Sequence, residues 1–253
     1  MNIFPENATT YGQEIDNLFY LILTFVAIAF VISVVVLFYP MFRYSEKRNP
    51  KAQYITGEKK SHFKWVMYAL IMLAMSDFII MYAEHGTWEK IEEDVPTDGI
   101  RVGITGIQWN WVFNYAGKDG KVMTADDIVI NEANSELHVP INTNIIMELR
   151  ARDVVHDVFL PNARTKYDVI PGRTHVKWAN FTKVGKYEVV CSQICGVLHS
   201  KMRNYIVVDT KEDYDKYMAA LYAKQDSANA PKPAAPAIDT TAKADSTKAA
   251  DKK

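Results

Sequence analysis

The sequence predicts a membrane-anchored, all-β protein in which a hairpin of two transmembrane helices precedes a β-sandwich. Two long stretches near the N-terminus carry almost no charge and indicate the helices. Short alternating segments separated by turn-forming residues follow them and indicate the β-domain. Apolar residues make up 49% of the 253 residues, yet the mean hydropathy is −0.13, so the hydrophobic residues must be concentrated in a few segments.

The composition excludes two broad classes of protein. Lys and Arg number 29 and Asp and Glu number 30, so no basic excess favours a nucleic-acid partner. The chain has only 2 cysteines, which is too few for a disulfide-dense secreted scaffold.

The first predicted membrane helix covers residues 18–39 and follows an outer N-terminal segment, residues 1–17. No charged residue interrupts this stretch from Leu18 to Tyr39, and about 20 apolar residues cross a bilayer core. A cleavable signal peptide is disfavoured because the apolar run is too long and no Lys or Arg precedes it.

The second predicted membrane helix covers residues 65–82 and contains one acid, Asp77. A carboxyl group within a span usually faces protein, which would place a second membrane subunit beside this helix. Alternatively, Asp77 lies near the outer interface and reaches water. The sequence leaves both interpretations open.

The connecting loop, residues 40–64, sets the orientation. It has a large excess of basic residues over its two acids, and the positive-inside rule therefore places it in the cytoplasm. Both termini are then expected on the outer side of the membrane, which the chain crosses twice. An exported domain behind an unprocessed first span, together with a low-complexity tail, favours the inner membrane of a bacterium, so the outer side would be the periplasm. The basic residues are Arg43, Lys47, Arg48, Lys51, Lys59, Lys60 and Lys64.

The β-domain is predicted over residues 98–223, after a linker at residues 83–97. Ile100, Val102 and Ile104 alternate with polar or small residues, and many short strands of this kind favour an antiparallel sandwich or barrel. Residues 211–223 have helical spacing and are expected to pack on the edge of the sandwich. Residues 224–253 are poor in large apolar residues, which predicts a disordered tail. Further strands are expected at residues 127–130, 144–149, 154–159, 175–181, 185–190 and 204–208.

The densest chemistry lies between Cys191 and Met202, where two thiols, one imidazole and one thioether occur within a single loop. Soft sulfur ligands with imidazole select copper, whereas structural zinc sites use four Cys or His ligands and no Met. A second imidazole, His156, stands at a predicted strand far upstream, and cupredoxin sites are built in this way. Mononuclear blue copper needs only one Cys, so two Cys favour a two-copper site with bridging thiolates.

A different interpretation needs no metal. Two cysteines in an exported domain often form a disulfide. The chain would then be a membrane-tethered β-domain stapled by Cys191 and Cys195 that serves as a binding or assembly module. The c-type haem motif Cys-x-x-Cys-His is absent from the sequence, so a redox role would require an electron donor on another protein or domain.

The loop C-S-x-x-C-G-x-x-H-x-x-M resembles that of cytochrome c oxidase subunit II, the haem–copper terminal oxidase subunit with a binuclear CuA centre. The similarity covers roughly residues 15–222 and implies a cupredoxin-like Greek-key β-sandwich. It implies that Cys191 and Cys195 bridge two coppers and that His156 and His199 each bind one. Weak axial ligands would be Met202 and the backbone carbonyl of Gln193. Most of the family has Glu at position 193, where the side chain also binds magnesium at the subunit I boundary, so Gln193 puts that magnesium in doubt.

The segment Gly106–Tyr115 resembles the family's aromatic motif G-x-Q-W-x-W-x-x-x-Y. By that resemblance electrons enter at Trp109, whereas Trp111 and Tyr115 are expected to be packing residues. Asp168–Arg173 resembles the family's D-A-I-P-G-R segment, which lies against subunit I; alternatively, it is a plain Pro-Gly turn. The family usually has a Glu three residues before the Trp that begins the second span, at the entrance of a proton path. Here that position is His62, and either His62 or Glu58 could take the role of this Glu; alternatively, His62 is simply an interfacial residue.

The resemblance implies a function for the whole chain. It would accept electrons from a c-type cytochrome, or from a haem domain of a neighbouring respiratory complex, and pass them to haem–copper subunit I. Other oxidase subunits and the lipid bilayer are the remaining partners implied. In subunit I oxygen is reduced to water and protons are translocated. Acidic residues of the exported domain are expected to steer a basic donor; they are Glu89, Glu92, Glu93, Asp94, Asp153 and Asp157.

Overall fold

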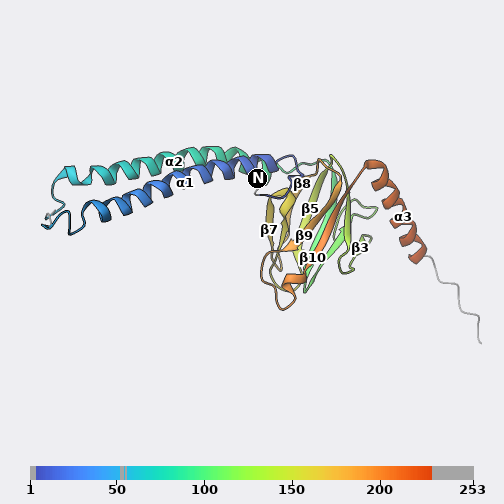
Figure 1. Cartoon of the computed structure of the whole chain (residues 1–253). Coiled ribbons are helices and arrows are strands. Elements are labelled where there is room, and N and C mark those ends of the chain that lie inside the picture. The colour runs from blue at the N-terminus through green and yellow to red at the C-terminus, as the bar shows by residue number, and fades with distance from the viewer. Residues whose placement is uncertain (1–3, 52–53, 55, 230–253) are drawn as a thin grey trace, which may run out of the picture.

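The computed structural model describes residues 4–51, 54 and 56–229. Two long helices lie side by side and project from one end of a two-layer β-domain, and a third helix lies on the opposite side of that domain (Figure 1). This arrangement confirms the predicted fold class, a two-helix anchor followed by a β-sandwich.

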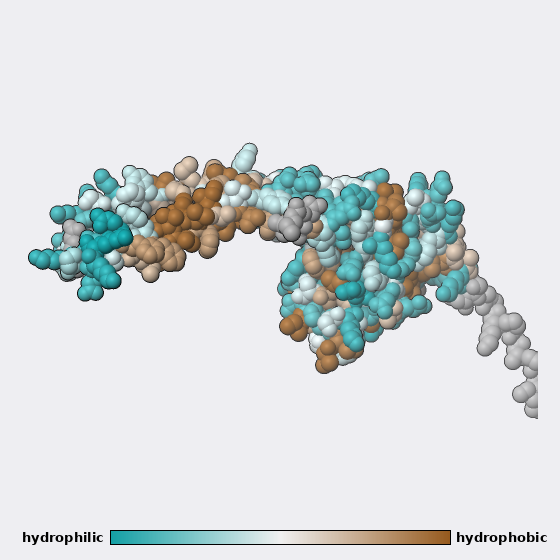
Figure 2. Space-filling view, in the orientation of Figure 1, coloured by the Kyte–Doolittle hydropathy of each residue, from teal (hydrophilic) through white to brown (hydrophobic). Residues whose placement is uncertain are grey.

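The hairpin consists of α1 (Gly12–Arg43) and α2 (Lys64–Trp88). Apolar side chains on both helices are exposed, and Figure 2 shows them as a continuous hydrophobic band between two hydrophilic ends. The hydroxyls of Thr24 and Ser33 donate to the backbone carbonyls of Tyr20 and Ala29 within the same helix. The band is therefore free of unsatisfied hydroxyl groups at these positions.

Both helices extend beyond the predicted spans. Helix α1 continues through Pro40 to Arg43, and α2 continues past Tyr82 to Trp88. A short 3₁₀ turn (Lys60–Phe63) precedes α2, and a π-helical turn (Glu89–Glu93) follows it. Part of the segment expected to be a linker is thus helical and leads directly into the sandwich.

The sandwich contains two five-stranded sheets. One sheet has the order β3-β2-β1-β5-β8 and the other β4-β10-β9-β6-β7. The strands are β1 (Ile100–Ile107), β2 (Asn110–Tyr115), β3 (Ile128–Ile130), β4 (Glu136–Pro140), β5 (Asn144–Ala151), β6 (His156–Leu160), β7 (Thr165–Val169), β8 (His175–Asn180), β9 (Gly185–Cys191) and β10 (Arg203–Asp209).

The expectation of purely antiparallel pairing is wrong at two places. Strand β1 pairs with β5 in parallel, and β10 pairs with β4 in parallel. Both pairs join strands that are distant in sequence, because the chain repeatedly crosses from one sheet to the other, as in a Greek-key sandwich. Strands β2, β4 and β7 were not among the predicted strands. In β7 the exposed Lys166 and Asp168 alternate with buried neighbours.

The core lies between the two sheets. Trp111, Phe113 and Tyr115 on β2 are almost completely buried, and the predicted packing role of Trp111 and Tyr115 is confirmed. Facing residues on the other sheet, such as Leu137 and Ile206, are also fully buried. Each such side chain stabilises the fold by about 1.5–3 kcal/mol through removal of apolar area from water.

The third helix, α3 (Lys211–Asn229), packs on the edge of the sandwich as expected. Its Tyr217 ring stacks on His138 of the edge strand β4, with 3.8 Å between ring centroids. Thr210 caps the helix by accepting the backbone N–H of Asp213 at 3.2 Å. Helix α3 extends to residue 229, so residues 224–229, expected to be part of the tail, are helical; the rest of the predicted tail lies outside the described residues.

Candidate metal centre

Two neighbouring strands bring the distant imidazole to the cysteine loop. Strand β6 begins at His156 and β9 ends at Cys191, and Val158 of β6 is in register with Cys191. The loop that follows returns to β10 after Met202, whose carbonyl accepts the backbone N–H of Cys191 at 3.2 Å. This hydrogen bond closes the base of the loop, so all predicted ligands lie at one end of the sandwich.

The donor atoms converge within this loop. One ligand atom each from His156, Cys191 and Cys195 lies within 4.8 Å of the others. The Cys195 sulfur is 3.6 Å from Nδ1 of His199 and 3.8 Å from Sδ of Met202. The Gln193 carbonyl oxygen is 3.1 Å from the Cys191 sulfur. Every residue predicted as a copper ligand is therefore present at the site.

The disulfide interpretation does not agree with the structure. The two sulfurs are 3.8 Å apart, and both cysteines are free thiols. A disulfide requires about 2.05 Å between the sulfur atoms.

His156 has the environment of a metal ligand. The side chain is fully buried, and its Nε2 lies 2.9 Å from Oδ1 of Asp153. Among the described residues none provides a hydrogen-bond partner for the buried Nδ1. Buried ring nitrogens are normally satisfied, and a carboxylate on one nitrogen orients the other toward a metal. The residues present therefore fit a soft cation bound at Nδ1.

The electrostatics of the two thiols lead to the same conclusion. Burial raises the pKa of Cys191, but the neighbouring His156 imidazole and backbone amides favour the thiolate more strongly, so the pKa is lowered to about 7. Burial and the neighbouring Cys191 thiolate raise the pKa of Cys195. Two adjacent thiolates form together only when a cation offsets their repulsion, which a copper pair would do.

Trp109 lies directly against the ligand loop. A Cβ atom added at Gly196 would come within 2.9 Å of the Trp109 indole nitrogen, and the side-chain amide of Gln108 donates to the Cys195 carbonyl at 2.7 Å. The Trp109 ring is only partly exposed. The aromatic segment and the cysteine loop thus form one unit.

Two predicted surface acids are not on the surface. Asp157 is fully buried and accepts a hydrogen bond from the Ser192 hydroxyl, and burial raises its pKa. Glu92 forms an ion pair with Lys177 and is mostly buried. Neither acid can steer a donor from these positions. Asp157 is instead a structural partner of the ligand loop. Its burial was not predicted, because its neighbours His156 and Val158 are also buried and the strand therefore lacks alternation here.

The Asp168–Arg173 segment forms a Pro-Gly turn after β7. Gly172 has φ +77°, a conformation that glycine adopts without steric cost, and Arg173 donates its backbone N–H to the Ile170 carbonyl at 3.1 Å. This observation agrees with the simpler of the two interpretations and leaves the contact with another subunit a prediction.

Comparison with known proteins gives the family of the β-domain. Residues 100–210 match the family of the cytochrome c oxidase subunit II periplasmic domain. The alternative cytochrome c oxidase subunit 2 of Bradyrhizobium diazoefficiens is 29% identical over 237 residues, which cover 83% of this chain and 81% of that protein. Cytochrome c oxidase subunit 2 of Thermostichus vulcanus is 34% identical over 54% of this chain and 36% of its own length.

The crystal structure of the periplasmic domain of subunit II of cytochrome oxidase from Bradyrhizobium japonicum was also found. It is 28% identical, with a TM-score of 0.44, and the match covers 51% of this chain and 98% of that domain. The sequence match to the Bradyrhizobium diazoefficiens protein extends beyond the β-domain. Residues 100–210 of this chain are therefore a domain of the cytochrome c oxidase subunit II periplasmic family.

Proposed function

We propose that this chain is the electron-accepting subunit of a haem–copper oxidase and that it holds a binuclear copper centre. The observation that carries the proposal is the convergence of His156, Cys191 and Cys195 within 4.8 Å, next to an imidazole nitrogen that has no hydrogen-bond partner among the residues that the structure describes. When bound, a copper pair of this kind takes up and releases one electron at a time.

The roles of the ligands follow from their chemistry. The thiolates of Cys191 and Cys195 and the imidazoles of His156 and His199 would hold the metals, because soft sulfur and imidazole ligands select copper. The Met202 thioether and the Gln193 carbonyl would be the weaker ligands. The protein holds these donors in a loop that is fixed at both ends by strands β9 and β10, so little of the chain has to move when an electron arrives.

Trp109 is proposed as the residue at which electrons enter the protein. Its indole is partly exposed and packs on Gly196, one residue from Cys195. A c-type cytochrome, or a haem domain of a neighbouring respiratory complex, would be the donor. Haem–copper subunit I would receive the electrons for oxygen reduction coupled to proton translocation. A magnesium ion at that boundary stays in doubt because Gln193 offers a neutral amide.

The proposed location is the inner membrane of a bacterium. Two candidate membrane helices support an anchor that crosses the bilayer twice. We place residues 40–64 in the cytoplasm and the β-domain, residues 98–223, on the periplasmic side together with both termini. The basic residues of the connecting segment support this orientation.

Copper analysis of the purified full-length chain tests the proposal. Two coppers per chain and a mixed-valence electron paramagnetic resonance signal are expected after loading. His156→Ala should lose one ligand and the mixed-valence signal, whereas His85→Ala, on the exposed surface of α2, should retain both. A chain that folds but binds no copper, or a His156→Ala variant with an unchanged spectrum, would contradict the proposal.

A further inference from the structure

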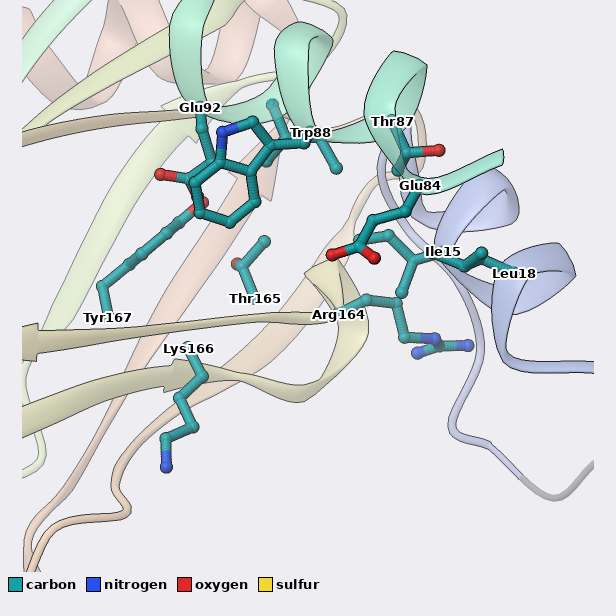
Figure 3. A pocket seen from close by; sticks show the side chains of 11 residues that line it. Ile15, Leu18, Glu84, Thr87, Trp88, Glu92, Arg164, Thr165, Lys166 and Tyr167 are labelled. Atoms are coloured by element: carbon teal, nitrogen blue, oxygen red, sulfur yellow. The ribbon is translucent and has the colours of Figure 1, made fainter. Parts of the chain in front are cut away.

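An open pocket of about 220 Å³ lies where the helical hairpin meets the β-sandwich (Figure 3). It lies between α1, α2 and strand β7. Its apolar wall includes Leu18, the first residue of the uncharged stretch of α1, and its rim on α2 begins at Glu84, two residues after Tyr82 ends the second apolar stretch. In the membrane-anchored protein the pocket therefore lies at the level of the lipid headgroups.

Some of the charged side chains that line the pocket have a partner of opposite charge, and others do not. Arg164 forms a two-pronged pair with Asp16, with 2.6 Å between Nε and Oδ1, and Glu92 pairs with Lys177. Lys166 points away from the pocket in Figure 3. Within the part of the chain that the structure describes, Glu84 has no hydrogen bond or ion pair, and its carboxylate is directed into the space between the helices and β7.

Aromatic side chains border the same space. The Trp88 indole is 54% exposed and, with Tyr167, forms one end of the pocket. An ammonium group already lies over one of these rings, since Lys177 Nζ is 5.0 Å from the Tyr167 centroid. An uncompensated carboxylate beside aromatic rings attracts cations, quaternary or primary ammonium groups above all.

We propose that this pocket binds the ammonium headgroup of a zwitterionic phospholipid. Glu84 would be its counter-ion and Trp88 its aromatic contact, and the acyl chains would follow the apolar surface of α1 from Leu18 into the bilayer. An anionic headgroup is disfavoured because Glu84 would repel it and because Asp16 already neutralises the guanidinium of Arg164. The surrounding bilayer would supply this phospholipid, because the pocket lies at the membrane surface.

Lipid co-purification measures this preference. The full-length chain would be reconstituted in bilayers with equal parts phosphatidylethanolamine, phosphatidylcholine and phosphatidylglycerol, extracted, and its retained lipid quantified by mass spectrometry. We expect one or both ammonium lipids to be enriched about fivefold over phosphatidylglycerol, as an exposed ion pair and a cation–π contact allow. The ethanolamine and choline arms distinguish a primary from a quaternary ammonium group.

Matched variants connect the enrichment to the pocket. Glu84→Gln should abolish it, because the amide carries no charge. Glu84 has no partner in the described part of the chain, so its loss should not disturb the fold. Glu89→Gln removes the same charge from an exposed residue that does not line the pocket, and should retain the enrichment. The proposal is overturned if Glu84→Gln retains wild-type enrichment or if phosphatidylglycerol is the enriched lipid. The same lipid analysis is made on the assembled oxidase. The proposal is also overturned if the oxidase shows no enrichment, since another subunit would then fill the pocket.

Discussion

Asp153 joins the aromatic segment to the ligand imidazole. Its Oδ2 accepts the backbone N–H of Gln108 at 2.7 Å, while its Oδ1 lies 2.9 Å from Nε2 of His156. One carboxylate thus fixes the tautomer of a proposed copper ligand and the position of the residue preceding Trp109. Metal-binding histidines depend on such partners for ring orientation and basicity.

Asp153→Ala is therefore expected to weaken copper binding by about 10–100-fold while the chain still folds. Competition with a copper chelator measures the change in affinity, and the mixed-valence signal reports the change in geometry. Asp94→Ala, at an exposed acid in front of the β-domain, is the control and should bind copper as the wild type does. Equal affinity of the two variants would show that Asp153 has no part in orienting His156.

Gly196→Ala should disturb the contact between the ligand loop and Trp109. Gly196 has φ +130°, and an added Cβ would approach the Trp109 indole nitrogen to 2.9 Å. Backbone strain of this kind costs about 1–3 kcal/mol. We expect a lower melting temperature and slower reduction by the donor.

Gly86→Ala is a suitable comparison for this substitution. Gly86 lies within α2, and a Cβ there would meet nothing within 4 Å. Alanine favours helix over glycine by about 0.5–1 kcal/mol, so this variant should be as stable as the wild type or more so. If both variants have the melting temperature and the reduction rate of the wild type, the close packing at Gly196 is not needed for stability or electron transfer.

Arg164→Ala should loosen the attachment of the hairpin to the sandwich. Arg164 and Asp16 have side-chain exposures of 7% and 12%, and the guanidinium also donates to the Pro161 carbonyl at 2.8 Å. Removing one partner of a buried pair leaves the other charge uncompensated and costs about 3–5 kcal/mol. Thermal unfolding of the detergent-solubilised chain should show this loss.

The pair between Lys183 and Glu6 provides the contrast, because it also joins the sandwich to the N-terminal segment. Its side chains are 50% and 69% exposed, and exposed pairs contribute only about 0–1 kcal/mol. Lys183→Ala should therefore change the melting temperature little. A loss as large as that of Arg164→Ala would argue against burial as the cause.

The pH dependence of stability should include a contribution from Glu136. A hydrogen bond from Lys186, at 2.5 Å, is the main reason that the pKa of Glu136 lies below its ordinary value of 4.5. A carboxylate with a lowered folded-state pKa stabilises the fold above its unfolded pKa, and the stabilisation is lost as the pH falls through the folded value. The effect should therefore be present at pH 6, decline as the pH falls below about 4.5, and be lost below the folded-state pKa.

Lys186→Gln removes the cause of this shift. The variant should melt at a lower temperature than the wild type at pH 6, and the difference should diminish on acidification. A difference that stays constant down to pH 3 would show that Lys186 stabilises the protein by another route.

Much of the site could be predicted because its information is local. Cys191, Gln193, Cys195, His199 and Met202 lie in one short loop, and their spacing alone defines a sulfur-rich donor set. His156 was predicted as a second imidazole at a strand far upstream, and the register between β6 and β9 explains its position beside Cys191. The uncharged stretches likewise predicted both helices, because a bilayer core requires a minimum apolar length.

The rest depends on contacts that are distant in sequence. Asp153 and Asp157 have the composition of surface acids, and only the packed structure shows that one orients His156 and the other is fully buried. The parallel pairing of β1 with β5 and of β10 with β4 follows from chain crossovers between the sheets, which local alternation does not encode. Helix ends were underestimated because amphipathic or polar turns at the membrane surface continue a helix beyond its apolar part.

The hydrogen bond between Cys191 and Met202 at the base of the ligand loop has a consequence for assembly. Both ends of the loop are fixed by paired strands, so the loop becomes ordered when the polypeptide folds. Its conformational entropy is therefore lost before any metal is present. Maturation can then proceed in a fixed sequence, with the protein shaped first and the ions inserted afterwards. The apo-domain would thus be a stable intermediate that waits for metal delivery.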